Sequence, residues 1–211
     1  MRLTKYEHAA FVLEHPEGTL VVDPGSFAAS LPALSGVVAI VVTHEHADHW
    51  TPDRLSALLE ANPGVPVFST AAVAQAAGAP PVEVVQAGEV RQAGPFTLSF
   101  HGGTHAVIHS SIPVIENVGV LVNDTLYYGG DAFHAPDGPI EVLAVPASAP
   151  WLKIAEVMDY VLAVKPKRSF PIHEALLSPA GLALSDARIK DATEAGGGEY
   201  IPLRPGESIE L

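Results

Sequence analysis

Short hydrophobic segments separated by turn residues dominate the first forty residues of the chain. Leu3–Tyr6, Ala10–Glu14 and Leu20–Val22 have the composition of short strands, and turn residues such as His15-Pro16-Glu17-Gly18 lie between them. The run Val37–Val42 is continuous and β-branched, which is typical of a strand that is covered on both faces. The pattern therefore predicts four strands, the last of which is buried.

The segment after the buried strand has the start and stop signals of a helix. Thr51 suits the N-cap, Pro52 suits the first helical position, and Asn62-Pro63-Gly64 ends the helix. The pattern then predicts, in order, a strand over Val65–Ser69, a short helix over Ala71–Ala77 and a strand over Val82–Gln86.

The second half of the chain repeats this style. Val118–Val122 and Leu126–Tyr128 flank Asn123-Asp124, which predicts a hairpin. Apolar residues at helical spacing from Trp151 to Val161 predict a helix that Trp151 anchors in the core; the alternative is that Ala149-Pro150-Trp151 touches the rim of the cleft. The other predicted elements are strands over Phe96–Phe100, Val142–Val145 and Arg168–Ile172, a helix over Pro179–Ala192, and short strands near Tyr200–Leu203 and Ser208–Glu210.

This order of elements fits two packed sheets with helices on the outside. The predicted fold class is α+β, as a four-layer αββα sandwich, although periodicity alone also allows other α+β folds. The sequence shows no linker, so we expect one domain over residues 1–211.

Composition narrows the class of protein. Eleven Lys and Arg stand against 24 Asp and Glu, a formal net charge of −13, which argues against binding to nucleic acid. The chain has no cysteine, which excludes disulfides, thiolate metal ligands and cysteine nucleophiles. With no signal-peptide pattern and no long apolar run, we expect a cytoplasmic protein that does not bind membranes.

One polar cluster follows the buried strand directly. His44, His46, Asp48 and His49 give the spacing H-x-H-x-D-H within six residues. Packing these groups together and removing them from water is costly unless something binds them, and a metal ion does so. The alternative is a solvated polar loop, or histidines that cap the next helix. Further polar sites, at Asp23, Asp131 and His173, also follow predicted strands, and His105 lies a few residues beyond one.

The chain resembles the metallo-β-lactamase-fold hydrolases. The motifs that carry the resemblance occur in the family's order, as VVDPG, THEHADHW, GTHA, GGDAF and PIHEA, and they span residues 8 to 173. The segment YEHAAFVLE, the compact length and APWLK make it most similar to the group that includes ascorbate-6-phosphate lactonase.

The resemblance implies a set of metal ligands. These are His44, His46 and His105 for a first metal, Asp48, His49 and His173 for a second, and Asp131 between the two. Asp23 would support the cluster from behind. Imidazole and carboxylate ligands without sulfur suit zinc first, and also manganese or iron.

The remaining histidines and a tryptophan have weaker expectations. His8, His109 and His134 are expected to line the site, His8 because the resembling group carries a histidine there. His101 is a rival to His105 as a ligand, and the family pattern favours His105. Trp50 is expected to pack under the metal loop.

The function that these residues predict is that of a metal-dependent hydrolase. A metal-bound hydroxide would attack a lactone, an ester or a phosphodiester in a small cytosolic substrate, and Asp48 would orient the nucleophile. The main alternative is a protein of the same fold that binds metal and ligand without turnover. A di-iron redox site and a site with a single metal also stay open, and the resemblance allows a homo-oligomer.

Overall fold

Two seven-stranded sheets form the centre of the computed structural model, which describes residues 1–77 and 82–211. The first sheet contains β1 (Arg2–Lys5), β2 (Phe11–His15), β3 (Gly18–Val22), β4 (Val37–Val41), β5 (Val67–Ser69), β6 (Val82–Val84) and β14 (Ser208–Glu210). Its strand order is β14-β1-β2-β3-β4-β5-β6. Strands β1, β2 and β3 pair antiparallel, and strands β3 to β6 pair parallel.

The second sheet has the same size. It contains β7 (Val90–Ala93), β8 (Phe96–Thr104), β9 (Glu116–Val122), β10 (Leu126–Tyr128), β11 (Val142–Pro146), β12 (Arg168–Ile172) and β13 (Glu199–Tyr200). The strand order is β13-β12-β11-β10-β9-β8-β7. The hairpin predicted at Asn123-Asp124 is present, because β9 and β10 pair antiparallel and both turn residues have positive φ.

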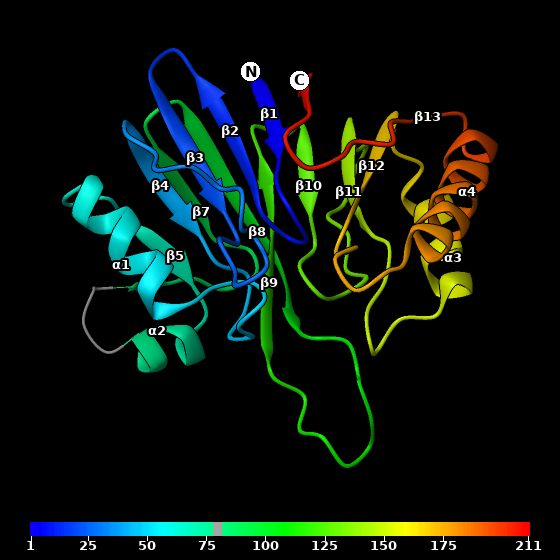
Figure 1. Cartoon of the computed structure of the whole chain (residues 1–211), viewed down its shortest axis with the longest axis horizontal. Helices are drawn as coiled ribbons and strands as arrows, with labels where there is room; N and C mark the ends of the chain where they lie inside the picture. Colours follow the sequence, from blue (N-terminus) through cyan, green and yellow to red (C-terminus); the bar gives the residue numbers. More distant parts are fainter. Residues whose placement is uncertain (78–81) are drawn as a thin grey trace.

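Four helices cover the outer faces of the two sheets. They are α1 (Pro52–Ala61), α2 (Ala71–Ala77), α3 (Ile154–Val164) and α4 (Pro179–Ala195). Figure 1 shows α1 and α2 on one side of the molecule and α3 and α4 on the other, with both sheets between them. The predicted four-layer αββα sandwich is therefore confirmed. Among the described residues, no helix is both long and apolar enough to cross a membrane.

The largest hydrophobic cluster lies between the sheets, and two smaller clusters lie under the helices. The central cluster joins residues of both sheets, such as Leu13 and Val41 of the first and Phe100 and Val120 of the second. Central strands such as β4 and β11 are covered on both faces and are apolar on both sides, as the run at 37–42 predicted. This rigid double layer fixes the loops at the strand ends.

Three elements of the structure differ from the prediction. β7 was not predicted, because VRQA is polar and forms an edge strand in which Val90 is exposed. The strand expected over Tyr200–Leu203 is reduced to β13, which ends at Tyr200. The helix expected from Trp151 begins only at Ile154, since the preceding residues form a turn in which the Leu152 N–H donates to the Ala149 carbonyl.

Candidate metal centre

The polar residues predicted from the sequence meet at one edge of the sandwich. Asp23 follows β3, His44 follows β4, Asp131 follows β10 and His173 follows β12. These strands run parallel within each sheet, so their carboxyl ends lie on one side. His105 joins them from the end of the antiparallel strand β8.

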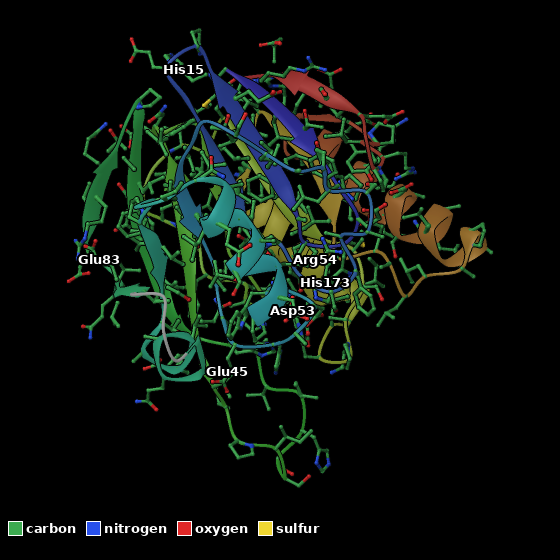
Figure 2. All side chains as sticks on the ribbon, turned by 60° about the vertical axis from the view of Figure 1, so that its left-hand side comes forward. His15, Glu45, Asp53, Arg54, Glu83 and His173 are labelled. Atoms are coloured by element: carbon green, nitrogen blue, oxygen red, sulfur yellow. The ribbon has the colours of Figure 1, made fainter. Side chains whose placement is uncertain are left out.

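Two groups of side chains at this edge could each hold a metal ion. In each group the ligand atoms lie within 4.8 Å of one another. The first group is His44, His46, His105 and Asp131, and the second is His8, Asp48, His49 and His173. All seven predicted ligands are thus brought together. Figure 2 shows His173 and Glu45 well away from His15, which lies at the opposite end of the molecule.

Asp131 faces both groups. Its Oδ1 lies 3.2 Å from His49 Nε2, and its Oδ2 lies 3.2 Å from His173 Nε2 and 3.5 Å from His105 Nε2. The carboxylate therefore contacts two histidines of the second group as well as one of the first. This position is the one that the bridging role predicted for Asp131 requires.

Three histidines of the centre share a hydrogen-bond pattern that leaves Nε2 free. Nδ1 of His105 donates to the Ala106 carbonyl at 2.6 Å, and Nδ1 of His173 donates to the Ser148 carbonyl at 2.5 Å. His49 Nδ1 donates in the same way to a carboxylate oxygen, Oδ2 of Asp23, at 2.6 Å. The Nε2 atoms of these three rings are buried, and none has a hydrogen-bond partner among the residues that the structure describes. Rings oriented through one nitrogen and bare at the other are typical of metal ligands.

Asp23 supports the centre from behind, as predicted. It is fully buried and accepts hydrogen bonds from the Thr43 N–H at 2.8 Å and from the Tyr128 hydroxyl at 2.7 Å. The Thr43 hydroxyl also donates to Asp23 at 2.7 Å, so the same oxygen can accept from His44 Nδ1 at 3.0 Å. One carboxylate thus orients His49 directly and His44 through Thr43.

The electrostatics of the centre suit a cation. Burial lowers the pKa of His44 well below its usual value, so this ring is neutral and can offer a lone pair. Burial alone would also lower the pKa of His49, but Asp131 and Asp23 raise it well above the usual value. Burial would lower the pKa of His173 as well, but Asp131 outweighs this effect and raises the pKa to about 9. Carboxylates that stabilise a proton on these rings can stabilise a metal ion in its place.

The remaining histidines are placed differently from one another. His8 belongs to the second group, with its Nε2 3.0 Å from Asp48 Oδ2. His101 lies outside both groups with its ring edge-on to Tyr127, which agrees with the choice of His105. His109 is exposed and pairs with Ser111, and His134 is exposed and packs against Gly102. The structure brings neither His109 nor His134 into the two groups.

Sequence reasoning missed the contacts that two side chains make with Asp131, and it missed the role of one glycine. Trp151 donates from Nε1 to Asp131 Oδ2 at 2.8 Å, so it touches the centre instead of anchoring a helix. Asn117 holds the same loop by accepting from the Asp131 N–H at 3.1 Å. Gly25 lies so close to the Asp48 carbonyl that a Cβ there would be 1.7 Å from its oxygen. Trp50, expected under the metal loop, is buried and donates to the Glu45 carbonyl.

A family model agrees with this geometry. The model of the beta-lactamase superfamily domain matches residues 2–173, which include every residue of both groups. The chain belongs to the beta-lactamase superfamily. Its fold is the metallo-β-lactamase fold, as solved structures also show. The finer resemblance to ascorbate-6-phosphate lactonase has no counterpart in these comparisons.

Two curated relatives are similar to this chain in sequence, one over most of the chain and the other over less than two thirds of it. The protein Rv0786c of Mycobacterium tuberculosis is 38% identical over 92% of this chain and 93% of its own length. A UPF0173 metal-dependent hydrolase of Aeropyrum pernix is 32% identical over 62% of this chain and 61% of its own length. The name of the second relative agrees with the metal-dependent hydrolase predicted from the sequence.

Two solved structures share the fold at low sequence identity. The metallo-beta-lactamase fold protein YhfI of Bacillus subtilis matches with a TM-score of 0.73 and 16% identity, over 100% of this chain and 99% of its own. CmlA, a diiron beta-hydroxylase of Streptomyces venezuelae, matches with a TM-score of 0.76 and 14% identity, over 100% of this chain and 54% of its own. The same fold therefore serves proteins with different activities.

Proposed function

We propose that this protein is a metal-dependent hydrolase that acts on a small molecule through a two-metal centre. The observation that carries the proposal is the bare, buried Nε2 of His49, His105 and His173, which converge on the Asp131 carboxylate. Buried polar atoms without a partner are costly, and a metal ion shared with Asp131 would satisfy all of them.

The donor set favours zinc, with manganese or iron as alternatives. The first metal would be held by His44, His46 and His105, the second by Asp48, His49 and His173, with Asp131 shared between them. Imidazole and carboxylate donors without sulfur suit all three metals. When bound, such an ion lowers the pKa of a coordinated water toward 7 and polarises the bond to be cleaved.

Asp48 is the residue that we assign to the reaction itself. Its side chain is 25% exposed, whereas that of Asp131 is only 4% exposed, so a substrate can reach Asp48. Burial opposes ionisation, but the hydrogen bond from His8 and the facing rings of His173 and His49 hold the pKa of Asp48 far below its usual value. The ionised carboxylate can accept a hydrogen bond from the attacking water and orient it toward the substrate.

The proposed substrate is a lactone, an ester or a phosphodiester of low molecular weight. A cavity of about 310 Å³ is lined by Thr70, Gln86, Gly102 and Asn117, among others. Asn117 joins the cavity to the centre, because its side chain also accepts from the Asp131 N–H. The net charge of −13 disfavours a nucleic-acid substrate, and we place the activity in the cytoplasm.

The test is a hydrolysis screen with zinc-reconstituted protein. The panel contains generic lactones, carboxylic esters and phosphodiesters, each assayed with and without a chelator. We expect turnover of at least one class that the chelator abolishes and that zinc restores. Turnover that survives the chelator would contradict the proposal, and zinc binding without turnover across the panel would favour the ligand-binding alternative.

Matched variants separate the centre from the rest of the protein. His46→Ala and Asp48→Ala should abolish turnover while leaving the circular dichroism spectrum close to wild type. His15→Ala is the control, because this histidine lies at the end of β2, at the opposite end of the molecule. Retained turnover in His46→Ala or in Asp48→Ala would refute the assignment of these residues.

A further inference from the structure

His8 differs from the other histidines of the centre in how its ring is held. It is fully buried just before β2, and its ring contacts that of His173, with the centroids 3.8 Å apart and the planes tilted by 45°. Its Nδ1 accepts a hydrogen bond from the Ala175 N–H at 3.3 Å. Its Nε2 lies 3.0 Å from Asp48 Oδ2.

These two contacts determine which nitrogen of His8 carries the proton. A ring nitrogen that accepts a hydrogen bond from a backbone N–H must hold a lone pair, so Nδ1 is bare. The proton of the ring is then on Nε2, and it is donated to Asp48. In His49, His105 and His173 the arrangement is reversed, since Nδ1 donates and Nε2 has no hydrogen-bond partner among the described residues.

We propose that His8 is a positioning residue for Asp48 and not a ligand of the second metal. The inference rests on the proposed metal-dependent function, and it removes one member from the four-residue group. His8 holds Oδ2 of Asp48 in place through its Nε2–H. The metal is left to Asp48, His49 and His173, together with the shared Asp131.

The surrounding backbone is built to keep His8 in this state. The His173 N–H donates to the His8 carbonyl at 2.9 Å, and both residues have φ near +62°, in the left-handed region. Lys5 Nζ pairs with Glu174 Oε1 at 2.5 Å in a buried ion pair. These contacts tie the segment before β2 to residues 173–175, so the Ala175 N–H stays directed at Nδ1.

Two substitutions of His8 distinguish a hydrogen-bond donor to Asp48 from a metal ligand. His8→Asn keeps an acceptor for the Ala175 N–H and suits the left-handed backbone, but its side chain is too short to donate to Asp48. His8→Gln is longer and can place an N–H near the position of Nε2. The controls are His49→Asn and His49→Gln, which remove a predicted ligand.

The metal-binding readout is zinc content at saturation together with zinc affinity from chelator competition. For His8→Asn we expect the wild-type number of zinc ions per chain and an affinity about 10- to 100-fold lower. For His8→Gln we expect a smaller loss of affinity than for His8→Asn. Both His49 variants should lose zinc ions. A zinc content in His8→Asn that falls as in the His49 variants would overturn the proposal, and so would an unchanged affinity.

A second readout observes the ring itself and does not depend on activity. Two-bond ¹H–¹⁵N correlation spectra of the full chain distinguish protonated, bare and metal-bound ring nitrogens. We expect His8 Nε2 to be protonated both before and after zinc is added, while His49 and His173 change. Loss of the Nε2 proton of His8 on zinc binding would overturn the inference and leave the proposed function standing. If the wild type bound no zinc, the proposed function would fail, and the metal-free spectrum would still test the tautomer.

Discussion

The indole of Trp151 fixes one oxygen of Asp131. Its Nε1 donates to Oδ2 at 2.8 Å, while Oδ1 of the same carboxylate is buried and has no hydrogen-bond partner. The two oxygens are therefore not equivalent. Oδ1 keeps its full capacity for a metal ion, whereas Oδ2 is oriented by the tryptophan.

Removing this contact should loosen the centre. In Trp151→Phe, Asp131 loses the donor that orients it, and groups that hold metal ligands in place are typically worth 10- to 100-fold in metal affinity. We expect a fall in zinc affinity of that size in a chelator-competition assay. Tyr160→Phe is the control, since its hydroxyl donates nearby to the His134 carbonyl and not to Asp131. Equal affinities in Trp151→Phe and wild type would show that the indole has no part in the centre.

Gly25 is required by the loop that carries Asp48. A Cβ at this position would lie 1.7 Å from the Asp48 carbonyl oxygen and 2.6 Å from the His49 nitrogen. Both are backbone atoms, so Gly25→Ala must move the loop, at a cost of about 3 kcal/mol or more. We expect lower zinc affinity and a lower free energy of unfolding, measured by denaturant titration.

The control for Gly25→Ala is a glycine whose nearest neighbour is the end of a side chain and not the backbone. Gly181 lies in the first turn of α4, and a Cβ there would be 3.2 Å from a methyl group of Leu177. Gly181→Ala should change stability by about 1 kcal/mol or less, because alanine also favours the helix. Wild-type stability and zinc affinity in Gly25→Ala would contradict the close approach.

The buried Lys5–Glu174 pair should be costly to break from one side. Burial lowers the pKa of Lys5, while Glu174 opposes that shift, and both side chains are almost fully buried. Lys5→Met leaves the Glu174 carboxylate buried without its partner, which typically costs about 3–5 kcal/mol. Unfolding in urea measures the loss.

A double variant and a surface control show whether the loss comes from the unpaired buried charge. Replacing both members, as Lys5→Met with Glu174→Leu, should restore most of the stability, since no charge stays buried. The exposed pair of Arg188 and Asp191 is the control, and Arg188→Met should cost less than about 1 kcal/mol. A loss in Lys5→Met no larger than in Arg188→Met would mean that the pair is not desolvated.

Local sequence patterns were enough to predict most elements of the fold. The continuous run at 37–42, the helix signals at Thr51 and Pro52, and the turn at Asn123-Asp124 all act over a few residues, and each appears as predicted. β7 was missed because an edge strand depends on its neighbour more than on its own composition. The prediction started the helix at Trp151, because this residue fits the helical spacing. In the structure the helix begins at Ile154, and Trp151 donates a hydrogen bond to Asp131 instead.

The members of the centre were predictable, but their hydrogen bonds were not. The H-x-H-x-D-H cluster and the residues after strands identify a metal centre, because ligand chemistry is written in residue type and spacing. Which nitrogen of His8 is protonated depends on the backbone of Ala175, which is 167 residues away along the chain. Contacts of this kind arise only from the packed fold, and the exposed positions of His109 and His134 likewise follow from loop geometry.

Metal content is the measurement that tests the central claim most directly. Protein purified without chelator and without a histidine tag should carry about two zinc, manganese or iron ions per chain by plasma mass spectrometry, one for each group. His46→Ala and His173→Ala should each lower that number by about one. Protein that stays free of metal after reconstitution, or that retains its full metal content in both variants, would contradict the two-metal centre.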